Sequence, residues 1–291
     1  MSGTDLSVII LSYKSKSDLE RLLPSIFGSR TKYSFEIIVV DNGSGDGAYE
    51  WLESWIASHR EHAVKAIKNS NTGFASGNNI GIRQAQGQYI LLLNPDTKVS
   101  PNTFEVMLDL MQSRPEIGIS GCKVVKPDGA LDLACRRRFP NPWNALRRFL
   151  HISKSEYNML DTDENTSMAV DSVMGAFLLI RRGVMEKIGL LDEDYFMYGE
   201  DLDWCWRCKA AGFEVWYHPE TSVTHFKGSS SSKIPFKALK WFHDAMWIFY
   251  RKHYSEKYPF FFNWLVFAGI YGRMGVLLIL NRFKKHPAVS R

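Results

Sequence analysis

Polar side chains that can bind a ligand follow three apolar stretches of the chain. Ser12 and Tyr13 come after SVIIL, Asp41 comes after EIIVV, and Asn94 and Asp96 come after YILLL. Asp and Asn are ordinary turn residues, so each position alone has a plain structural explanation. Their recurrence is more informative, because ligands of open α/β sheets bind where successive strands end and the loops diverge.

The two acids suit different parts of one ligand. The carboxylate of Asp41 can accept a hydrogen bond from an imide N–H or a ribose hydroxyl, which suits uracil or thymine. Asp96 suits a hard divalent cation, which prefers carboxylate oxygen and often shares its coordination shell with phosphates. A base at one end and a diphosphate at the other is the predicted ligand outline.

The segment GEDLDW begins a predicted helix with three acids in its first turn, Glu200, Asp201 and Asp203. Acidic first turns are common because they complement the helix dipole. A general base that takes a proton from an attacking hydroxyl is the functional alternative. The sequence leaves both interpretations open.

His225 and a run of three arginines also have two interpretations each. His225, in VTHFKG after a predicted strand, is either a core or surface histidine or a second metal ligand beside Asp96. Arg136, Arg137 and Arg138 form either a solvated face or a phosphate clamp.

The four cysteines do not indicate a disulfide framework in a chain of this length. Cys205 and Cys208 form a CxxC inside a helical pattern, without a second pair to complete a zinc site, so we expect packed core thiols rather than metal or redox chemistry. The N-terminal sequence has no basic region followed by a cleavage site, and we expect a cytoplasmic setting.

The elements that must position these residues alternate along the first half of the chain. Residues 6–11, 35–40, 64–68 and 89–93 are short β-rich runs, and amphipathic helical patterns separate them. This alternation predicts right-handed βαβ units on a largely parallel, Rossmann-like sheet. The glycine-rich segment NTGFASGNNIGI predicts a close approach of backbones.

Beyond residue 117 the pattern predicts a strand and hairpin. Residues 172–180 then predict a single strand, residues 200–211 a helix that ends at Gly212, and residues 213–217 a further strand.

Residues 260–280 are almost entirely apolar and long enough to span a bilayer. Arg273 near the middle disfavours a spanning helix. We expect a helix in the membrane interface or re-entering it, with a buried packing or dimer helix and a true span as alternatives. The loop at residues 229–232 comes before this segment, and its flanking cations are Arg251, Lys252, Arg282, Lys284 and Lys285.

Composition limits the class of protein. With 291 residues, 45% hydrophobic and 23% charged, the chain has the composition of one enlarged α/β domain with an appendage, which excludes wholesale disorder and fibres. The net charge of +5 suits an anionic ligand, a membrane surface or a nucleic acid. There is no GxxxxGK[ST], and no GxGxxG between the first strand and helix, so nucleoside triphosphate hydrolysis and dinucleotide redox chemistry lose support.

Seven segments, in order and spacing, resemble the inverting family 2 glycosyltransferases, and bacterial rhamnosyltransferase-like members in particular. They are SVIILSY, VVDNGSGDG, NTGFASGNNIGI, YILLLNPDT, VMGAFLLIRR, FMYGEDLDWCWR and HFKGSS. The resemblance covers roughly residues 5–230 and implies the GT-A fold of nucleotide-diphospho-sugar transferases, a mostly parallel sheet flanked by helices. It implies a transferase domain at residues 1–230, divided into a nucleotide-binding half (1–115) and an acceptor and catalytic half (116–230), and a helical membrane-associating extension at 231–291.

By position, the resemblance implies a donor site at the N-terminal strand ends. Ser12, Tyr13 and Asp41 would hold the nucleotide base, and Asn71 and Asn79 would lie along the donor pocket.

The resemblance also implies a divalent cation, Mg²⁺ or Mn²⁺. Asp96 would be the surviving acid of the family's DxD element, in which Asn94 replaces the first acid, and His225 would be a further metal ligand. Asp201 would be the catalytic base. Further candidates for binding the acceptor or a phosphate are Glu200, Arg136, Arg137 and Arg138.

The implied reaction is the transfer of one sugar per binding event in cell-wall or surface polysaccharide assembly. We expect dTDP-L-rhamnose as donor, with a UDP-sugar as the alternative, and a polyprenyl-diphosphate-linked saccharide as acceptor. The enzyme would bind peripherally to the cytoplasmic face of the membrane and would bind no nucleic acid. It would be able to form a homodimer.

Two other functions remain as alternatives. A sugar nucleotidylyltransferase would need a glycine-rich, basic first loop, where this chain has SYKS. The hypothesis of a non-catalytic module that binds nucleic acid or membrane does not explain the acids Asp41, Asp96 and Asp201.

Overall fold

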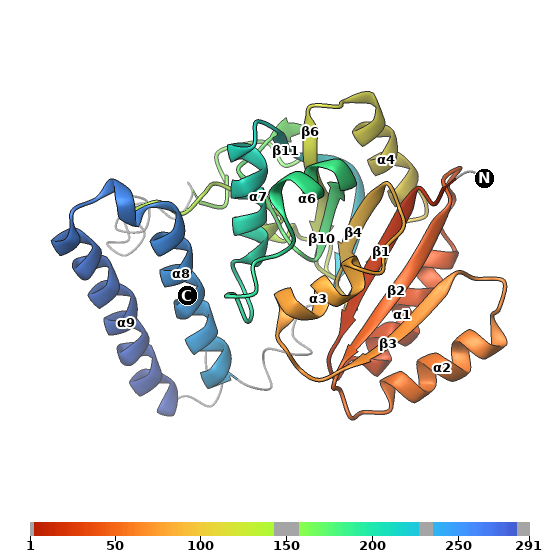
Figure 1. Cartoon of the computed structure of the whole chain (residues 1–291), viewed down its shortest axis with the longest axis horizontal. Coiled ribbons are helices and arrows are strands. Elements are labelled where there is room, and N and C mark those ends of the chain that lie inside the picture. The colour runs from red at the N-terminus through yellow and green to blue at the C-terminus, as the bar shows by residue number, and fades with distance from the viewer. Residues whose placement is uncertain (1–2, 143–156, 227–234, 284–291) are drawn as a thin grey trace.

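The computed structural model describes residues 3–142, 157–226 and 235–283. Figure 1 shows helices packed around a central sheet, and beside this body the two C-terminal helices α8 (Pro235–His253) and α9 (Phe260–Arg282). The predicted loop at residues 229–232 and the predicted flanking cations Lys284 and Lys285 lie outside the described residues.

The first half of the chain alternates strands with helices, as the sequence predicts. Its elements are β1 (Leu6–Ser12), α1 (Lys16–Phe27), β2 (Phe35–Asn42), α2 (Ala48–Ser58), β3 (Val64–Asn69), α3 (Phe74–Ile82), β4 (Tyr89–Leu93) and α4 (Thr103–Ser113). The strands pair in the order β3-β2-β1-β4, and each of these pairings is parallel. The register places Ser12 directly opposite Asp41, so two predicted ligand residues share one edge of the sheet.

The second half extends this sheet with strands of mixed direction. Its elements are β5 (Thr97–Val99), β6 (Ile117–Val125), β8 (Met168–Ala169), β10 (Phe177–Arg181), α6 (Arg182–Ile188), α7 (Glu200–Ala210) and β11 (Glu214–His225). The order continues β4-β10-β6-β11-β5, in which β6 and β11 are parallel while β10 and β5 are antiparallel to their neighbours. The predicted strand at 213–217 therefore continues to His225 and returns to the C-terminal end of β4.

The predicted single strand at residues 172–180 is two strands. β9 (Ser172–Val173) pairs with β7 (Arg136–Arg137) in a small separate sheet, and only β10 joins the main sheet. The pairing with β7 draws the first two residues away from β10. The break leaves the backbone N–H of Gly175 free to bind a side chain of α7.

Helix α3 packs on β1 through glycines. A Cβ at Gly77 would lie 2.5 Å from Leu11, and one at Gly81 would lie 2.6 Å from Ile9. Both distances are shorter than carbon contacts allow. The predicted close approach of backbones is confirmed, and it fixes the loop before α3 (residues 70–73) against the end of β1.

The four cysteines are buried free thiols. Burial raises the pKa of Cys135 to about 11 and that of Cys208 to about 12, so both stay protonated at neutral pH. Across the described ranges, no three His, Cys, Asp or Glu residues form a cluster suited to a metal ion. The cysteines are core residues, as predicted.

Helix α8 docks on α7 and on the loop before it. Phe249 packs in a small apolar cluster with Tyr195 and Leu202. At the end of α8, His253 Nε2 lies 2.8 Å from Asp203 Oδ1. The C-terminal helices are therefore fixed to the same helix that carries Asp201.

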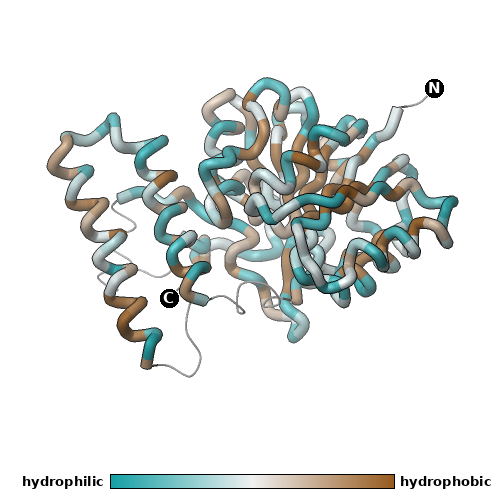
Figure 2. The backbone as a smooth tube through the Cα atoms, turned by 60° about the horizontal axis from the view of Figure 1, so that its bottom comes forward, coloured by the Kyte–Doolittle hydropathy of each residue, from teal (hydrophilic) through white to brown (hydrophobic). Residues whose placement is uncertain are grey.

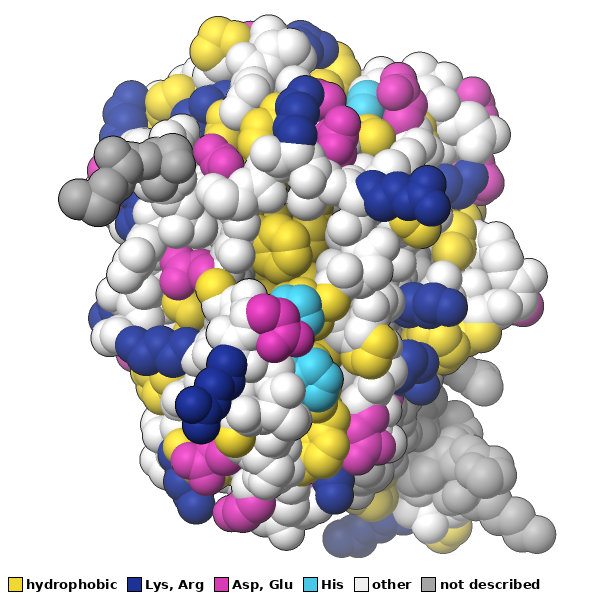
Figure 3. All heavy atoms as spheres, turned by 90° about the vertical axis from the view of Figure 1, so that its right-hand side faces the viewer, with side chains coloured by type: hydrophobic (Ala, Val, Ile, Leu, Met, Phe, Trp, Pro, Cys, Tyr) yellow, Lys and Arg dark blue, Asp and Glu magenta, His cyan; other side chains and the backbone are white. Residues whose placement is uncertain are grey.

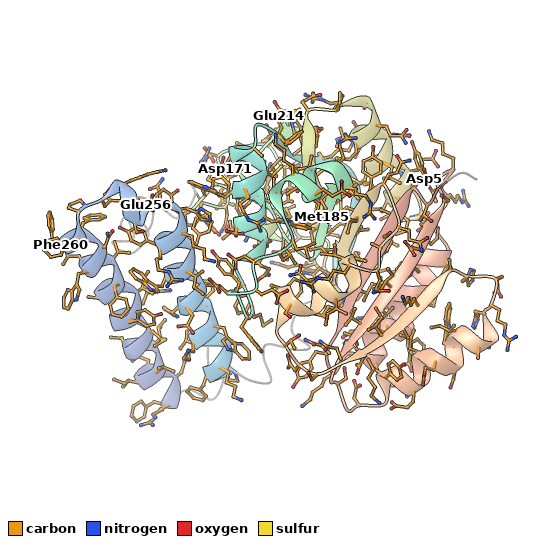
Figure 4. All side chains as sticks on the ribbon, viewed as in Figure 1. Asp5, Asp171, Met185, Glu214, Glu256 and Phe260 are labelled. Carbon is orange, nitrogen blue, oxygen red and sulfur yellow. The ribbon has the colours of Figure 1, made fainter. Side chains whose placement is uncertain are left out.

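Helix α9 contacts α8 and leaves an apolar face exposed. Tyr250 donates to Asn263 across the two helices at 2.6 Å, and Arg273 lies 3.3 Å from His243 of α8, on the inner side. Figure 2 shows apolar residues along α9, and Phe260 in Figure 4 projects away from the body of the molecule. By length and composition alone, α9 can cross a membrane. Large apolar side chains exposed on it include Phe260, Phe261, Trp264, Leu265, Val276 and Ile279.

Candidate active site

The predicted base-binding residue Asp41 lies buried at the C-terminal end of β2. Its Oδ2 accepts a hydrogen bond from the backbone N–H of Ser44 at 3.3 Å, while its Oδ1 has no partner among the described residues. Buried polar atoms are nearly always hydrogen-bonded, and an unpaired one costs free energy. This oxygen is therefore ready for an N–H or O–H of a ligand.

Ser12 and Tyr13 form the first loop beside Asp41. The Ser12 hydroxyl is buried and lies 2.9 Å from the Ser15 hydroxyl. Lys14, with φ at +53°, donates its backbone N–H to Ser44 at 3.0 Å. Ser12 thus shapes the loop through its own bonds, and the half-buried Tyr13 is the residue of the pair that can face a ligand.

The two predicted donor-pocket asparagines have different environments. Asn71 is exposed at the same edge of the sheet, where its Oδ1 accepts hydrogen bonds from Asn42 and Gly73 at 3.2 Å each. Asn79 is buried and bonds the backbone of Leu191 through both ends of its amide. The structure brings Asn71 to the rim of the site and uses Asn79 to hold α3 to the loop before α7.

Asp96 and His225 meet as the sequence predicts. Strand β11 pairs His225 with Thr97, and this register brings His225 Nε2 to 3.2 Å from Asp96 Oδ1. Asn94 precedes them, with its backbone N–H bonded to Ala176 at 3.1 Å. The carboxylate of Asp96 suits Mn²⁺ or Mg²⁺, and the imidazole of His225 favours Mn²⁺ of the two, provided that substrate phosphates and water complete the coordination.

Asp132 is a residue of this site that the sequence did not indicate. Its Oδ2 lies 3.4 Å from His225 Nδ1, and its Oδ1 caps the short helix η1 (Leu133–Cys135) by accepting from Ala134 at 3.2 Å. Burial lowers the pKa of His225, but the two carboxylates outweigh it and raise this pKa to about 9. In the sequence, Asp132 resembles an ordinary turn residue, and nothing local relates it to a histidine so far along the chain.

The predicted base, Asp201, is held by three donors. Its Oδ2 accepts from Arg137 at 2.7 Å and from the backbone N–H of Gly175 at 3.0 Å, and its Oδ1 accepts from Leu202 at 2.7 Å. The ring of Phe74, the first residue of α3, lies within 4 Å of the position that a Cβ at Gly175 would take. The carboxylate therefore lies near the start of α3 with its orientation fixed.

The three arginines do not act as one group. Arg137 is buried; burial lowers its pKa, but the charge of Asp201 outweighs this and raises the pKa, so the guanidinium stays charged. Arg136 is also buried and donates to the carbonyls of Thr162 and Asp163 at 2.9 and 2.7 Å, whereas Arg138 pairs with Asp161 at 2.8 Å. Neither a common solvated face nor a common phosphate clamp describes them, because each has its own partner within the chain.

Glu200 is a neutral neighbour of Asp201. Burial, and then the charge of Asp201, raise its pKa to about 8. Its Oε2 has no hydrogen-bond partner among the described residues. A buried carboxyl group with a strongly raised pKa is typical of sites that carry out acid–base chemistry.

Comparison with known proteins gives relatives and a fold. The family model described as glycosyl transferase family 2 matches residues 7–189. A Mycobacterium tuberculosis N-acetylglucosaminyl-diphospho-decaprenol L-rhamnosyltransferase is 27% identical over 86% of this chain and 85% of its own length. A low-salt glycan biosynthesis hexosyltransferase of Haloferax volcanii is 28% identical over 72% of this chain and 64% of its own length.

Among solved structures, a mannosyltransferase from Pyrobaculum calidifontis in complex with GDP-Man and Mn²⁺ superimposes with a TM-score of 0.63. The match covers 93% of this chain and 70% of that one, at 17% identity, and it confirms the GT-A fold. The match to the family model extends over more than half of the chain and includes the strand ends from Ser12 to Asp96. The chain therefore belongs to glycosyl transferase family 2 and is a glycosyltransferase.

Proposed function

We propose that this enzyme transfers a sugar, with inversion, from a nucleoside-diphosphate sugar to a hydroxyl of a lipid-linked saccharide. The observation that carries the proposal is the layout of one sheet edge. Along the sheet order β2-β1-β4-β10, the unpaired oxygen of Asp41 lies at the end of β2 and the Asp96–His225 pair lies beyond the end of β4. Asp201 follows, bonded to Gly175 just before β10. These positions suit a base, a diphosphate and the reacting sugar, in that order.

In this proposal Asp201 accepts the proton of the acceptor hydroxyl, which attacks the anomeric carbon as the nucleoside diphosphate leaves. A single base on the face opposite the leaving group gives inversion and requires no enzyme nucleophile. Arg137 pairs with the carboxylate and fixes its direction. A divalent cation held by Asp96 and His225 supplies, when bound, stabilisation of the charge that develops on the diphosphate.

Asp132 orients His225 in this account. With Nδ1–H of His225 donating to Asp132, a metal ion that displaces the proton of Nε2 would bind this nitrogen beside Asp96. A carboxylate behind a metal-binding histidine commonly fixes its tautomer and ring direction.

The proposed donor is dTDP-L-rhamnose, and the proposed acceptor is a polyprenyl-diphosphate-linked saccharide. The rhamnosyl group and the lipid-linked acceptor rest on the name of the Mycobacterium relative, since the fold alone does not select a sugar. The pyrimidine nucleotide rests on the unpaired oxygen of Asp41. Asp41 suits thymine and uracil equally. The thymine methyl group discriminates by only about 1 to 3 kcal/mol, so a UDP-sugar is the second candidate donor.

We further propose residues 1–230 as the transferase domain, with a nucleotide-binding half at 1–115 and an acceptor half at 116–230. Residues 231–291 would hold the enzyme peripherally on the cytoplasmic face of the membrane. The exposed apolar face of α9 supports membrane contact, and it also suits a second copy of the chain. The face shown in Figure 3 carries interspersed charges of both signs, which gives no support there to nucleic-acid binding.

Thermal shift with a panel of nucleotides tests the donor. We expect dTDP, UDP and their sugars to raise the melting temperature in the presence of Mn²⁺ or Mg²⁺, because a ligand at 100 times its Kd stabilises by about 2.7 kcal/mol. Asp41→Ala should remove this shift. Equal stabilisation by purine nucleotides, or an unchanged shift in the variant, would contradict the assignment of Asp41 to the base.

A further inference from the structure

A cavity of about 290 Å³ lies outside the donor site, between α8, α9 and the loop before α7. Its walls include the rings of Phe196, Trp241 and Tyr271, and its polar groups include the carboxylates of Asp194 and Asp244. The Phe196 and Trp241 rings have their centroids 4.5 Å apart. The volume is at the low end of ligand pockets and is small enough to select a single ring.

The chemistry of the lining fits a sugar. A pyranose presents C–H groups on its faces, which pack on aromatic rings, and hydroxyls around its edge, which donate to carboxylates. A cation is a poorer occupant, because each acid already has a basic partner. Asp244 lies 2.6 Å from Lys240, and Asp194 lies 2.6 Å from Lys252.

The cavity adjoins the catalytic helix. Ala245, in its wall, packs so closely on Gly199 that a Cβ at Gly199 would lie 3.2 Å from the Ala245 Cβ. Gly199 is two residues before Asp201. On the other side, the carbonyl of Phe196 accepts from the backbone N–H of Phe74 at 2.6 Å, at the start of α3. The cavity therefore borders Gly199, next to the start of the helix that carries the proposed base, and, through Phe196, the start of α3.

From this placement we propose that the cavity binds a sugar ring of the acceptor, with Trp241 and Phe196 packing on the ring and Asp244 accepting from its hydroxyls. The inference rests on the proposed function and gives it an acceptor subsite. Tyr271, on the inner side of α9, donates to Asp244 at 3.1 Å, while the opposite side of α9 is the exposed apolar face. A lipid-linked acceptor that arrives along that face would present its sugar at this cavity.

The test uses the full-length enzyme with labelled dTDP-L-rhamnose and N-acetylglucosaminyl-diphospho-decaprenol in detergent micelles. Trp241→Ala should raise KM for the lipid acceptor at least tenfold, while Kd for dTDP stays within twofold of the wild type. Asp244→Asn should raise the same KM less. Trp247→Ala is the matched control, because Trp247 lies on the same helix, packs on Phe267 of α9 and is outside the cavity wall.

The outcomes separate this inference from the function on which it rests. If Trp241→Ala does not fold, Trp241→Phe replaces it and should raise KM only slightly, with Asp244→Asn carrying the test. An unchanged acceptor KM in Trp241→Ala and Asp244→Asn, or an equal rise in Trp247→Ala, would overturn the subsite. A wild-type enzyme that binds dTDP but neither binds nor glycosylates this acceptor would also overturn it while the donor site stands. Failure to bind any nucleotide would instead contradict the proposed function.

Discussion

The acids at the donor edge, Asp41 and Asp96, and the acids of α7 differ in their partners within the protein. At the donor edge, Asp41 keeps one oxygen unpaired, and Asp96 has a histidine as its ion-pair partner. On α7, Asp201 is paired with Arg137, and Asp203 is paired with both Arg207 and His253. Asp41 and Asp96 can therefore still bind ligand groups. On α7, the ion pairs instead fix the direction of the carboxylates.

The largest expected effect is on Asp201. Asp201→Asn should leave the donor Kd unchanged and lower kcat by about 10² to 10⁴, because the amide does not accept the proton. It should also lower the melting temperature, because the buried Arg137 loses its anionic partner. The matched control is Asp203→Asn, two residues along the same helix and facing α8. It should lower the melting temperature and leave kcat close to that of the wild type. Near-normal turnover of Asp201→Asn would remove Asp201 as the base and make Glu200 or Asp203 the next residue to test.

Breaking the pair behind Asp201 should affect stability most. Arg137→Ala leaves a buried carboxylate without its cation, and the loss of one partner of a buried ion pair costs about 3 to 5 kcal/mol. Denaturant unfolding measures this change. Arg138→Ala, which breaks the half-exposed pair with Asp161, is the control and should change stability little. Equal effects of the two variants would show that Arg137 has no special role in holding Asp201.

The affinity for Mn²⁺ should depend on both carboxylates that contact His225. Asp96→Ala and Asp132→Asn should each weaken Mn²⁺ binding, and for Asp132→Asn the loss should be about 10- to 100-fold. Electron paramagnetic resonance of free Mn²⁺ measures this binding. In Asp132→Asn, an amide that keeps the cap of η1 offers its N–H₂ group to His225 Nδ1 and favours the wrong tautomer. Mn²⁺ binding that neither variant changes would contradict a metal at this pair.

A separate effect is the pH dependence that Glu200 gives to the stability of the fold. Its pKa is about 8 in the folded protein against 4.5 ordinarily, so its proton stabilises the folded state fully below about pH 4.5. That contribution is lost as the pH rises through 8. Glu200→Gln does not titrate, and its unfolding free energy should decline less between pH 5 and pH 8 than that of the wild type. Parallel declines in the two proteins would mean that Glu200 is ionised in the folded state.

The contrast between the two regions also explains what the sequence could predict. The donor edge follows from strand periodicity, because parallel strands bring their ends to one edge whatever the details of packing. Asp41 and Asp96 were found for this reason.

The surroundings of Asp201 depend on long-range pairings that have no periodic signal. The break between β9 and β10 frees Gly175, and the pairing of β7 with β9 brings in Arg137. The position of Asp132 behind His225 is of the same kind. For α9, the apolar run predicted the helix, but only its packing on α8 shows that Arg273 faces inward and leaves an apolar outer face.

The most direct test of the central claim is the product of a single reaction. The wild-type enzyme is supplied with dTDP-L-rhamnose, whose anomeric configuration is known, and with N-acetylglucosaminyl-diphospho-decaprenol and Mn²⁺, and the anomeric configuration of the new linkage is read by nuclear magnetic resonance. The account predicts a rhamnosylated lipid with the anomeric configuration inverted relative to the donor. Retention of configuration, or no transfer from a donor that binds, would contradict it.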